Sequence, residues 1–87
     1  MWKIEWQESA RKSLRKLDKQ TQERILRYLK DRIQPAEDPQ VYGKGLVAEL
    51  SGYWRYRVGD YRLVCKIFHE TITIVVVDVD HRKEINQ

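Results

Sequence analysis

The sequence has little of what most enzyme sites need. Its single cysteine, Cys65, rules out a disulfide within the chain, which is typical of proteins from a reducing cytoplasm. It has two histidines, His69 and His81, no HExxH motif and no Cys/His spacing typical of metal ligands. We therefore expect no metal and no cofactor. Cys65 falls on the apolar side of its predicted strand, where a small buried hydrophobe is expected rather than a nucleophile.

The chain also lacks long apolar runs. Residues 1–6 alternate apolar and polar side chains, unlike the continuous apolar segment of a signal peptide, and no stretch is long enough to cross a membrane. Gly43-Lys44-Gly45 does not match the phosphate loop of nucleotide-binding proteins, which needs a longer spacing between its glycines. These absences predict a cytoplasmic protein with no membrane contact.

What is present is a small basic chain. Its 87 residues suffice for one domain, residues 1–87, whose core is marginal unless the fold is economical or a partner adds to it. The 17 basic and 13 acidic residues give a net charge of +4. A basic surface that also carries aromatic side chains favours nucleic acid or an acidic protein segment as its partner, rather than a membrane.

The spacing of apolar residues predicts an α+β fold. Residues 2–6 alternate as a half-buried strand does, and two helices follow, divided at Asp18 and ended by Pro35. Residues 71–80 form the strongest predicted strand, apolar on both faces and therefore central. The order is β-α-α-β-β-β, with a helical hairpin packed on one face of a four-stranded, largely antiparallel sheet. The helix positions predicted to face inward are Ala10, Leu14, Leu17, Ile25, Leu26, Leu29 and Ile33.

The most informative stretch is residues 52–68, which predicts two strands joined by a tight turn at Gly59-Asp60. A two-residue turn places Arg57 directly opposite Arg62, and like charges in that position repel. Asp60 is the only acid nearby and sits in the turn, so we expect the cluster to meet its counter-charge in a phosphate or carboxylate ligand. A merely solvated basic face is the alternative. The basic residues on this side are Arg55, Arg57, Arg62 and Lys66.

Strand alternation also places His81 on the arginine side, beside Arg62, although a frayed terminal residue is an equally open interpretation. Such a set can cleave RNA without a metal, because the 2′-OH of the substrate attacks the adjacent phosphate. The protein then positions the phosphate, neutralises the developing charge and manages two protons. Arginine neutralises charge but stays protonated, so it is a poor general base. Val64, Val75 and Val77 on the same side are predicted to be uncovered, which is also typical of a protein-binding groove.

Residues 50–64 (LSGYWRYRVGDYRLV) and 79–85 (VDHRKEI) closely resemble the RelE/ParE toxin superfamily, and the similarity extends over essentially the whole chain. The resemblance implies the toxin of a bacterial type II toxin–antitoxin pair. In the RelE branch this toxin is a metal-independent endonuclease that cuts mRNA in the ribosomal A site. The resemblance also implies a RelB-like antitoxin that wraps the toxin, in a complex that binds operator DNA through the antitoxin.

By position, Arg55 and Arg57 resemble the groups that hold the scissile phosphate and activate the 2′-OH. Arg62 resembles the arginine that braces the phosphate, and Arg82 the arginine that assists the leaving group. The best-known RelE toxin has lysines at the strand positions, so the resemblance puts more weight on His81 as the base. The candidate catalytic residues are Arg55, Arg57, Arg62, His81 and Arg82, and the candidate substrate-binding residues are Lys44, Lys66 and Asn86.

Two other functions stay open on the same scaffold. One is a ParE-like inhibitor of DNA gyrase, and the other is a non-catalytic module that binds antitoxin or nucleic acid. The arginine cluster followed by His81-Arg82 favours the endonuclease, because ParE branches need no phosphate-cleaving set.

Asn86 stands where the family usually has a tyrosine that orients or stacks on the substrate base, and an amide offers little stacking area. We expect Asn86→Tyr to raise cleavage about 5- to 150-fold, the rate equivalent of about 1–3 kcal/mol of base stacking. The measurement is single-turnover cleavage of ribosome-bound mRNA by both proteins after removal of the antitoxin. Asn86 is either the natural residue of a slower toxin or an attenuating change, and both alternatives predict this increase. Equal rates would show that the tail takes no part in the chemistry and that His81 and the strand arginines carry it without help.

Overall fold

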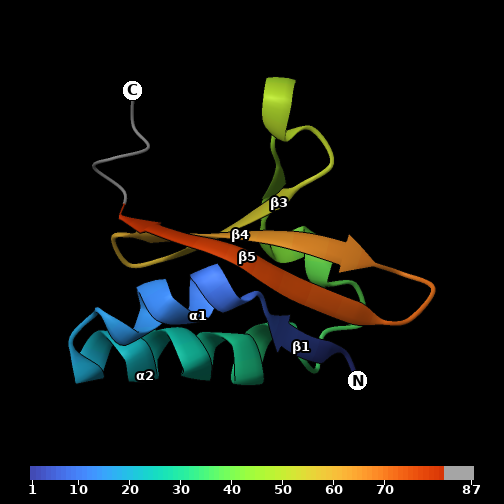
Figure 1. The fold of residues 1–87 in the computed structure, drawn as a ribbon. Helices are drawn as coiled ribbons and strands as arrows, with labels where there is room; N and C mark the ends of the chain where they lie inside the picture. The colour runs from blue at the N-terminus through green and yellow to red at the C-terminus, as the bar shows by residue number, and fades with distance from the viewer. Residues whose placement is uncertain (82–87) are drawn as a thin grey trace.

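The computed structural model describes residues 1–81, which form one five-stranded sheet and two helices (Figure 1). The strand order is β1-β5-β4-β3-β2, with β1 parallel to β5 and every other pair antiparallel. The predicted α+β class is confirmed. β5 is an interior strand, paired with β1 on one side and β4 on the other, and β2, a two-residue edge strand, is added to the four predicted. The strands are β1 Lys3–Trp6, β2 Lys44–Gly45, β3 Trp54–Val58, β4 Tyr61–Phe68 and β5 Thr73–His81.

The two helices, α1 Glu8–Arg15 and α2 Lys19–Tyr28, are separated at Asp18 as predicted. A π-helical turn, Leu29–Ile33, continues α2, and the backbone N–H of Gln34 donates to Leu29 O at 2.8 Å. No helix in the described part of the chain is long and apolar enough to cross a membrane.

Both helices lie on the same face of the sheet and bury their apolar stripes against it (Figure 1). Leu26 was expected in this stripe but is 45% exposed. Its neighbour Ile25 already faces the sheet, and a step of one residue turns the side chain about 100° around a helix of 3.6 residues per turn. The buried core residues are Trp2, Ala10, Leu14, Ile25, Leu29, Ile33, Tyr56, Val58, Leu63, Cys65, Ile74, Val76 and Val79.

The connection between the helices and β3 is fixed by two aromatic side chains of β3. The hydroxyl of Tyr56 donates to Pro39 O at 2.8 Å inside the core, and Trp54 Nε1 donates to Gln40 O at 3.1 Å. Burial raises the pKa of the Tyr56 hydroxyl far above its ordinary value, so it remains a donor. These bonds hold residues 39–42 against the edge of the sheet, next to β2.

A β-bulge interrupts the pairing of β4 with β5. Cys65 pairs with Val76, whereas its neighbour Val64 pairs with Asp78, so Val77 is an extra residue in β5. Because side chains alternate along a strand, one extra residue exchanges the two faces of everything that follows it.

The bulge overturns the expected position of His81. Beyond it, Arg62 pairs with Asp80, and His81 pairs with Tyr61 on the helix-facing side of the sheet. The connection from β4 to β5 spans residues 69–72, whereas the sequence predicts a tight turn at residues 69–70. The two additional residues are an even number, so they do not change which face each side chain of β5 takes. Sequence alternation was therefore correct for β3 and β4 and wrong for the end of β5.

Tyr56→Phe removes the hydroxyl that satisfies Pro39 O in the core. We expect the free energy of unfolding to fall by about 1–3 kcal/mol, the cost of a buried acceptor left without a donor. Urea unfolding followed by circular dichroism measures this. Tyr53→Phe is the matched control, because Tyr53 is half-exposed. A loss no larger than that of the control would show that the Tyr56 bond is energetically neutral.

Candidate functional site

The face of the sheet opposite the helices carries five basic side chains, and we call it the arginine face. Arg57 pairs directly with Arg62 across β3 and β4, and Lys44 pairs with Arg55 across β2 and β3. The turn that sets this register is Gly59-Asp60, as predicted, and Gly59 has the positive φ of 60° that a two-residue hairpin turn requires. The arginine face consists of Lys44, Arg55, Arg57, Arg62 and Lys66.

The three arginines of the arginine face repel one another. Partial burial and the charges of Arg57 and Arg62 lower the pKa of Arg55 from its ordinary value. Within the described residues, neither Arg55 nor Arg57 has a carboxylate at ion-pair distance. An anion bound here would relieve the repulsion, so the arrangement favours anion binding.

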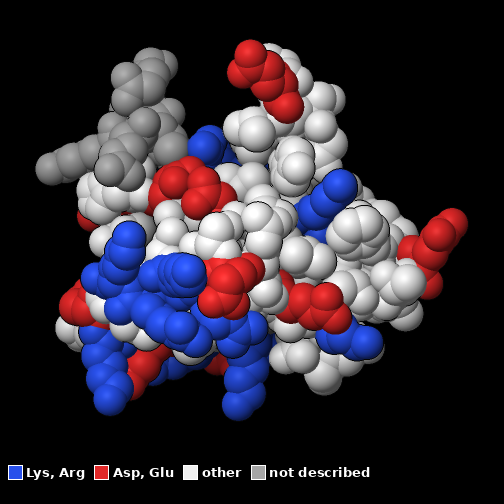
Figure 2. Space-filling view, in the orientation of Figure 1, with Lys and Arg blue, Asp and Glu red and all other residues white. Residues whose placement is uncertain are grey.

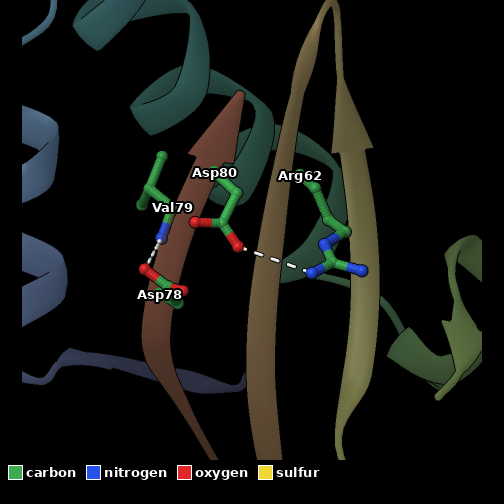
Figure 3. Close-up of polar contacts among 4 residues, drawn as sticks. All are labelled: Arg62, Asp78, Val79 and Asp80. Carbon is green, nitrogen blue, oxygen red and sulfur yellow. Dashed lines mark hydrogen bonds and ion pairs between the residues drawn. The ribbon is translucent and has the colours of Figure 1, made fainter. Parts of the chain in front are cut away.

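Arg62 differs, because the chain supplies its counter-charge. Its Nη2 lies 3.4 Å from Asp80 Oδ2, and the two side chains are 17% and 26% exposed (Figure 3). The expectation that the whole cluster awaits an external counter-charge was therefore wrong for Arg62, since the bulge turns Asp80 onto this face. Arg62 Nε is buried and has no hydrogen-bond partner in the described part of the chain.

Asp78 lies on the arginine face as well and was not identified from the sequence. Its Oδ1 accepts a hydrogen bond from the backbone N–H of Val79 at 2.9 Å (Figure 3). Burial raises the pKa of the Asp78 carboxyl, the neighbouring Asp80 raises it further, and Arg62 partly opposes them. The sequence shows an Asp-Val-Asp pattern at 78–80, but only the bulge decides which face the two carboxylates take.

Asp78 and Arg62 line a hollow of about 380 Å³. Its other walls include Ser9 at the start of α1 and Tyr53 before β3. Val64, expected to be uncovered, is only 4% exposed in the floor of this hollow. The hollow thus brings a guanidinium, a carboxyl with a raised pKa and two hydroxyls to one place.

A second hollow on this face, of about 330 Å³, is lined by Lys44, Arg55 and Arg57 together with Tyr42. The predicted substrate-binding Lys44 thus shares a site with two of the arginines. Lys66 lies apart, with its Nζ 5.7 Å from the ring centroid of Tyr53 and an exposed side chain.

The histidines do not join these groups. The ring of His81 packs edge-on against Tyr61 with the centroids 5.0 Å apart, on the helix-facing side, and His69 packs against Trp2 in the same manner at 5.5 Å. Arg82 and Asn86, also predicted from the sequence, lie outside the described residues.

The cysteine lies away from the arginine face. Cys65 is fully buried on the core side, and burial raises the pKa of its thiol to about 12, so a thiolate does not form near neutral pH. Within residues 1–81, no group of three or more His, Cys, Asp or Glu side chains could hold a metal ion. The arginine face can bind and polarise an anion, and Asp78 can exchange a proton.

Comparison with known proteins identifies the family. The family described as "ParE toxin of type II toxin-antitoxin system, parDE" matches residues 4–86. The chain belongs to this family. The toxin is also 42% identical to "Toxin RelG" of Mycobacterium tuberculosis over 50 residues, which span 58% of this chain and 58% of that relative.

Solved structures agree with this assignment. The toxin–antitoxin complex RelBE2 from Mycobacterium tuberculosis contains a chain with a TM-score of 0.84 and 31% identity, covering 93% of the toxin and 91% of that chain. The isolated Escherichia coli RelE toxin has a TM-score of 0.72 at 19% identity, covering 93% of the toxin and 84% of that chain, which supports the fold alone. The predicted RelE/ParE superfamily membership is confirmed, and the chain is a toxin of a type II toxin–antitoxin system.

Proposed function

We propose that the toxin is a metal-independent endonuclease that cuts mRNA in the ribosomal A site and so inhibits translation. The observation that carries the proposal is the clustering of Arg55, Arg57 and Arg62 on one open face, with a single carboxylate partner among them. Three guanidiniums with one carboxylate between them among the described residues suit a phosphate, and most of all the additional charge that a phosphate gains in its transition state.

In this proposal the 2′-OH of the substrate attacks the neighbouring phosphorus. The bond from O2′ to phosphorus forms, the bond from phosphorus to O5′ breaks, one proton leaves the 2′-OH and another goes to O5′. Arg55 and Arg57, which line one hollow, hold the phosphate in line. Arg62, oriented by Asp80, stabilises the developing charge.

The proton acceptor we propose is Asp78 in place of His81. His81 packs edge-on against Tyr61 on the opposite side of the sheet, whereas Asp78 lines the same hollow as Arg62. A raised pKa brings a carboxyl closer to the operating pH, where a general base works best. The role of Arg82 as the group that assists the leaving oxygen comes only from the resemblance to RelE.

The proposed partners follow from the same face. Structures related to this toxin are toxin–antitoxin complexes, among them RelBE2 and the intact Escherichia coli RelBE complex. We propose that a RelB-like antitoxin with acidic and aliphatic residues covers the arginine face, and that the complex binds operator DNA through the antitoxin. Ribosome binding would place the free toxin in the cytoplasm.

Inhibition of DNA gyrase is the second candidate, because the matching family carries the ParE name. A gyrase inhibitor has no use for a phosphate-cleaving set, so the arginine face argues for the nuclease. Induction of the toxin in cells, with translation and plasmid supercoiling followed in parallel, separates the two. If plasmid supercoiling is lost before translation stops, the toxin is a gyrase inhibitor.

Arg62→Ala should lower ribosome-dependent mRNA cleavage by a factor on the order of 10², the effect of removing one preorganised charge contact. Toeprinting of ribosome-bound mRNA measures the rate. Asp80→Asn is the matched control, because it breaks the same ion pair but keeps the guanidinium, and it should retain most of the activity. If Arg62→Ala cuts at the parental rate, Arg62 does not belong to the site. Equal losses in both variants would mean that cleavage needs the intact ion pair and not the Arg62 guanidinium by itself.

Asp78→Asn should lower cleavage by about 10²-fold, as expected for the loss of a general base, and should also change the pH profile. A base works when deprotonated, so parental cleavage should rise with pH through a midpoint above the ordinary aspartate pKa of about 3.9, and Asp78→Asn should flatten this rise. Asp80→Asn should move the midpoint to lower pH, because the charge of Asp80 raises the pKa of Asp78. Single-turnover rates across the pH range in which ribosomes stay intact test this, and an unchanged profile in Asp78→Asn would exclude Asp78 as the acceptor.

A further inference from the structure

The net positive charge of the toxin resides in its helical layer. Residues 8–33 contain nine basic and four acidic residues, an excess of five, whereas the whole chain carries +4. Blue side chains accordingly gather over α1 and α2 in Figure 2, on the side of the molecule away from the arginine face. This charge has no part in the proposed cleavage site.

One part of this layer is hollowed. The α2 cleft, of about 380 Å³, is lined by Arg24, Arg27 and Arg32 from α2 and the π-helical turn, and by Arg57 from β3. Among the described residues, Asp31 is the one carboxylate in its walls. Within residues 1–81, none of the four arginines has a carboxylate at ion-pair distance.

One of these guanidiniums lies against the hairpin turn. A Cβ atom at Gly59 would lie 2.8 Å from Arg24 Nη1, closer than real contacts allow. The bare backbone of Gly59 therefore lets Arg24 lie over the turn, beside the end of β3. Arg24 of α2 and Arg57 of the hairpin thus bring two positive charges to the same end of the sheet.

Two side chains connect the α2 cleft with the arginine face. Arg57 lines both the cleft and the hollow that contains Lys44 and Arg55. The guanidinium carbon of Arg32 lies 5.7 Å from the ring centroid of Tyr42, and Tyr42 lines that same hollow. A basic path therefore runs from the arginine face around the edge of the sheet to α2.

We propose that the α2 cleft is a second phosphate site for RNA, and that the strand held at Arg55 and Arg57 continues along this path to Arg24, Arg27 and Arg32. The inference rests on the proposed function, because it extends the strand that is cut. Guanidinium forks match phosphate oxygens, and the 44% exposed Tyr42 offers a ring on which a base can stack.

The cleft suits RNA better than a protein helix. A docked helix needs an apolar groove, but the apolar residues in the walls of the cleft are Val58, which is buried, and Tyr28, which is half-buried. The charged rim is what remains accessible. A chain of regularly spaced anions uses that rim without needing apolar contact.

The experiment measures how tightly the toxin, freed of antitoxin, binds a fluorescent single-stranded RNA of about 20 nucleotides. The RNA is 2′-O-methylated so that it cannot be cut.

We expect the double variant Arg24→Gln/Arg27→Gln to bind this RNA at least about tenfold more weakly, since each arginine contributes a charge-assisted contact. Its slope of log affinity against log salt should fall by about 1.4, since each single-strand phosphate contact contributes about 0.7. The matched control is Arg11→Gln/Arg15→Gln, which removes the same charge from exposed positions on α1 outside the cleft. The control should retain nearly the parental slope, and circular dichroism and thermal unfolding should show all three proteins equally folded.

Three results would overturn the inference. Equal losses in both double variants would mean that only the overall charge matters. If Arg24→Gln/Arg27→Gln binds the RNA with the affinity of the parental toxin, the cleft takes no part in RNA binding. Unchanged RNA binding together with weaker binding of the protein encoded by the neighbouring reading frame would make the cleft an antitoxin site. Failure of the proposed function gives a different result. A toxin that binds this RNA with the expected salt slope but does not cut ribosome-bound mRNA would support the RNA site in the α2 cleft and contradict the nuclease proposal.

Discussion

The chemistry available to this toxin depends on one extra residue in β5. Val77 takes up a position in the strand without a partner in β4, and the alternation of side chains reverses beyond it. Without the bulge, Val79 and His81 would share a face with Arg62. With it, Asp78 and Asp80 take that face, and His81 turns toward Tyr61. A local change in backbone pairing thus exchanges an imidazole for two carboxylates.

The carboxylates divide the arginines into two kinds. Arg62 is largely buried and tied to Asp80, so its guanidinium is fixed before any ligand arrives. A partly buried pair of this kind contributes little net stability, because desolvation offsets most of the attraction, but it determines orientation. Arg55 and Arg57 have no such partner among the described residues and repel each other and Arg62. Directly opposed like charges are destabilising, so a bound anion would lower the repulsion that the free protein carries.

A chain of 87 residues has little core with which to hold such a face. The toxin places the basic residues on a sheet whose other side is filled by two helices, so the same strands supply the core and the site. The hydrogen bonds from Tyr56 to Pro39 and from Trp54 to Gln40 fix the connection that carries Tyr42 and Lys44. The hollow lined by Tyr42 and Lys44 therefore rests on a segment that is hydrogen-bonded to β3.

The sequence by itself determined the α+β class, the division of the helices at Asp18, the hairpin at Gly59-Asp60, the pairing of Arg57 with Arg62 and the superfamily. These follow from apolar spacing, turn chemistry and a short motif, all of which are local in the chain. Only the tertiary structure decided the partner of Arg62, the positions of Asp78 and His81, and the joining of α2 to the arginine face through Arg57. A bulge leaves no residue type as its signature, since it arises from how two strands pair, and contacts between a helix and a distant turn depend on how the layers pack. Alternation read from the sequence assumes unbroken pairing, and it fails at the first residue beyond the place where that pairing shifts.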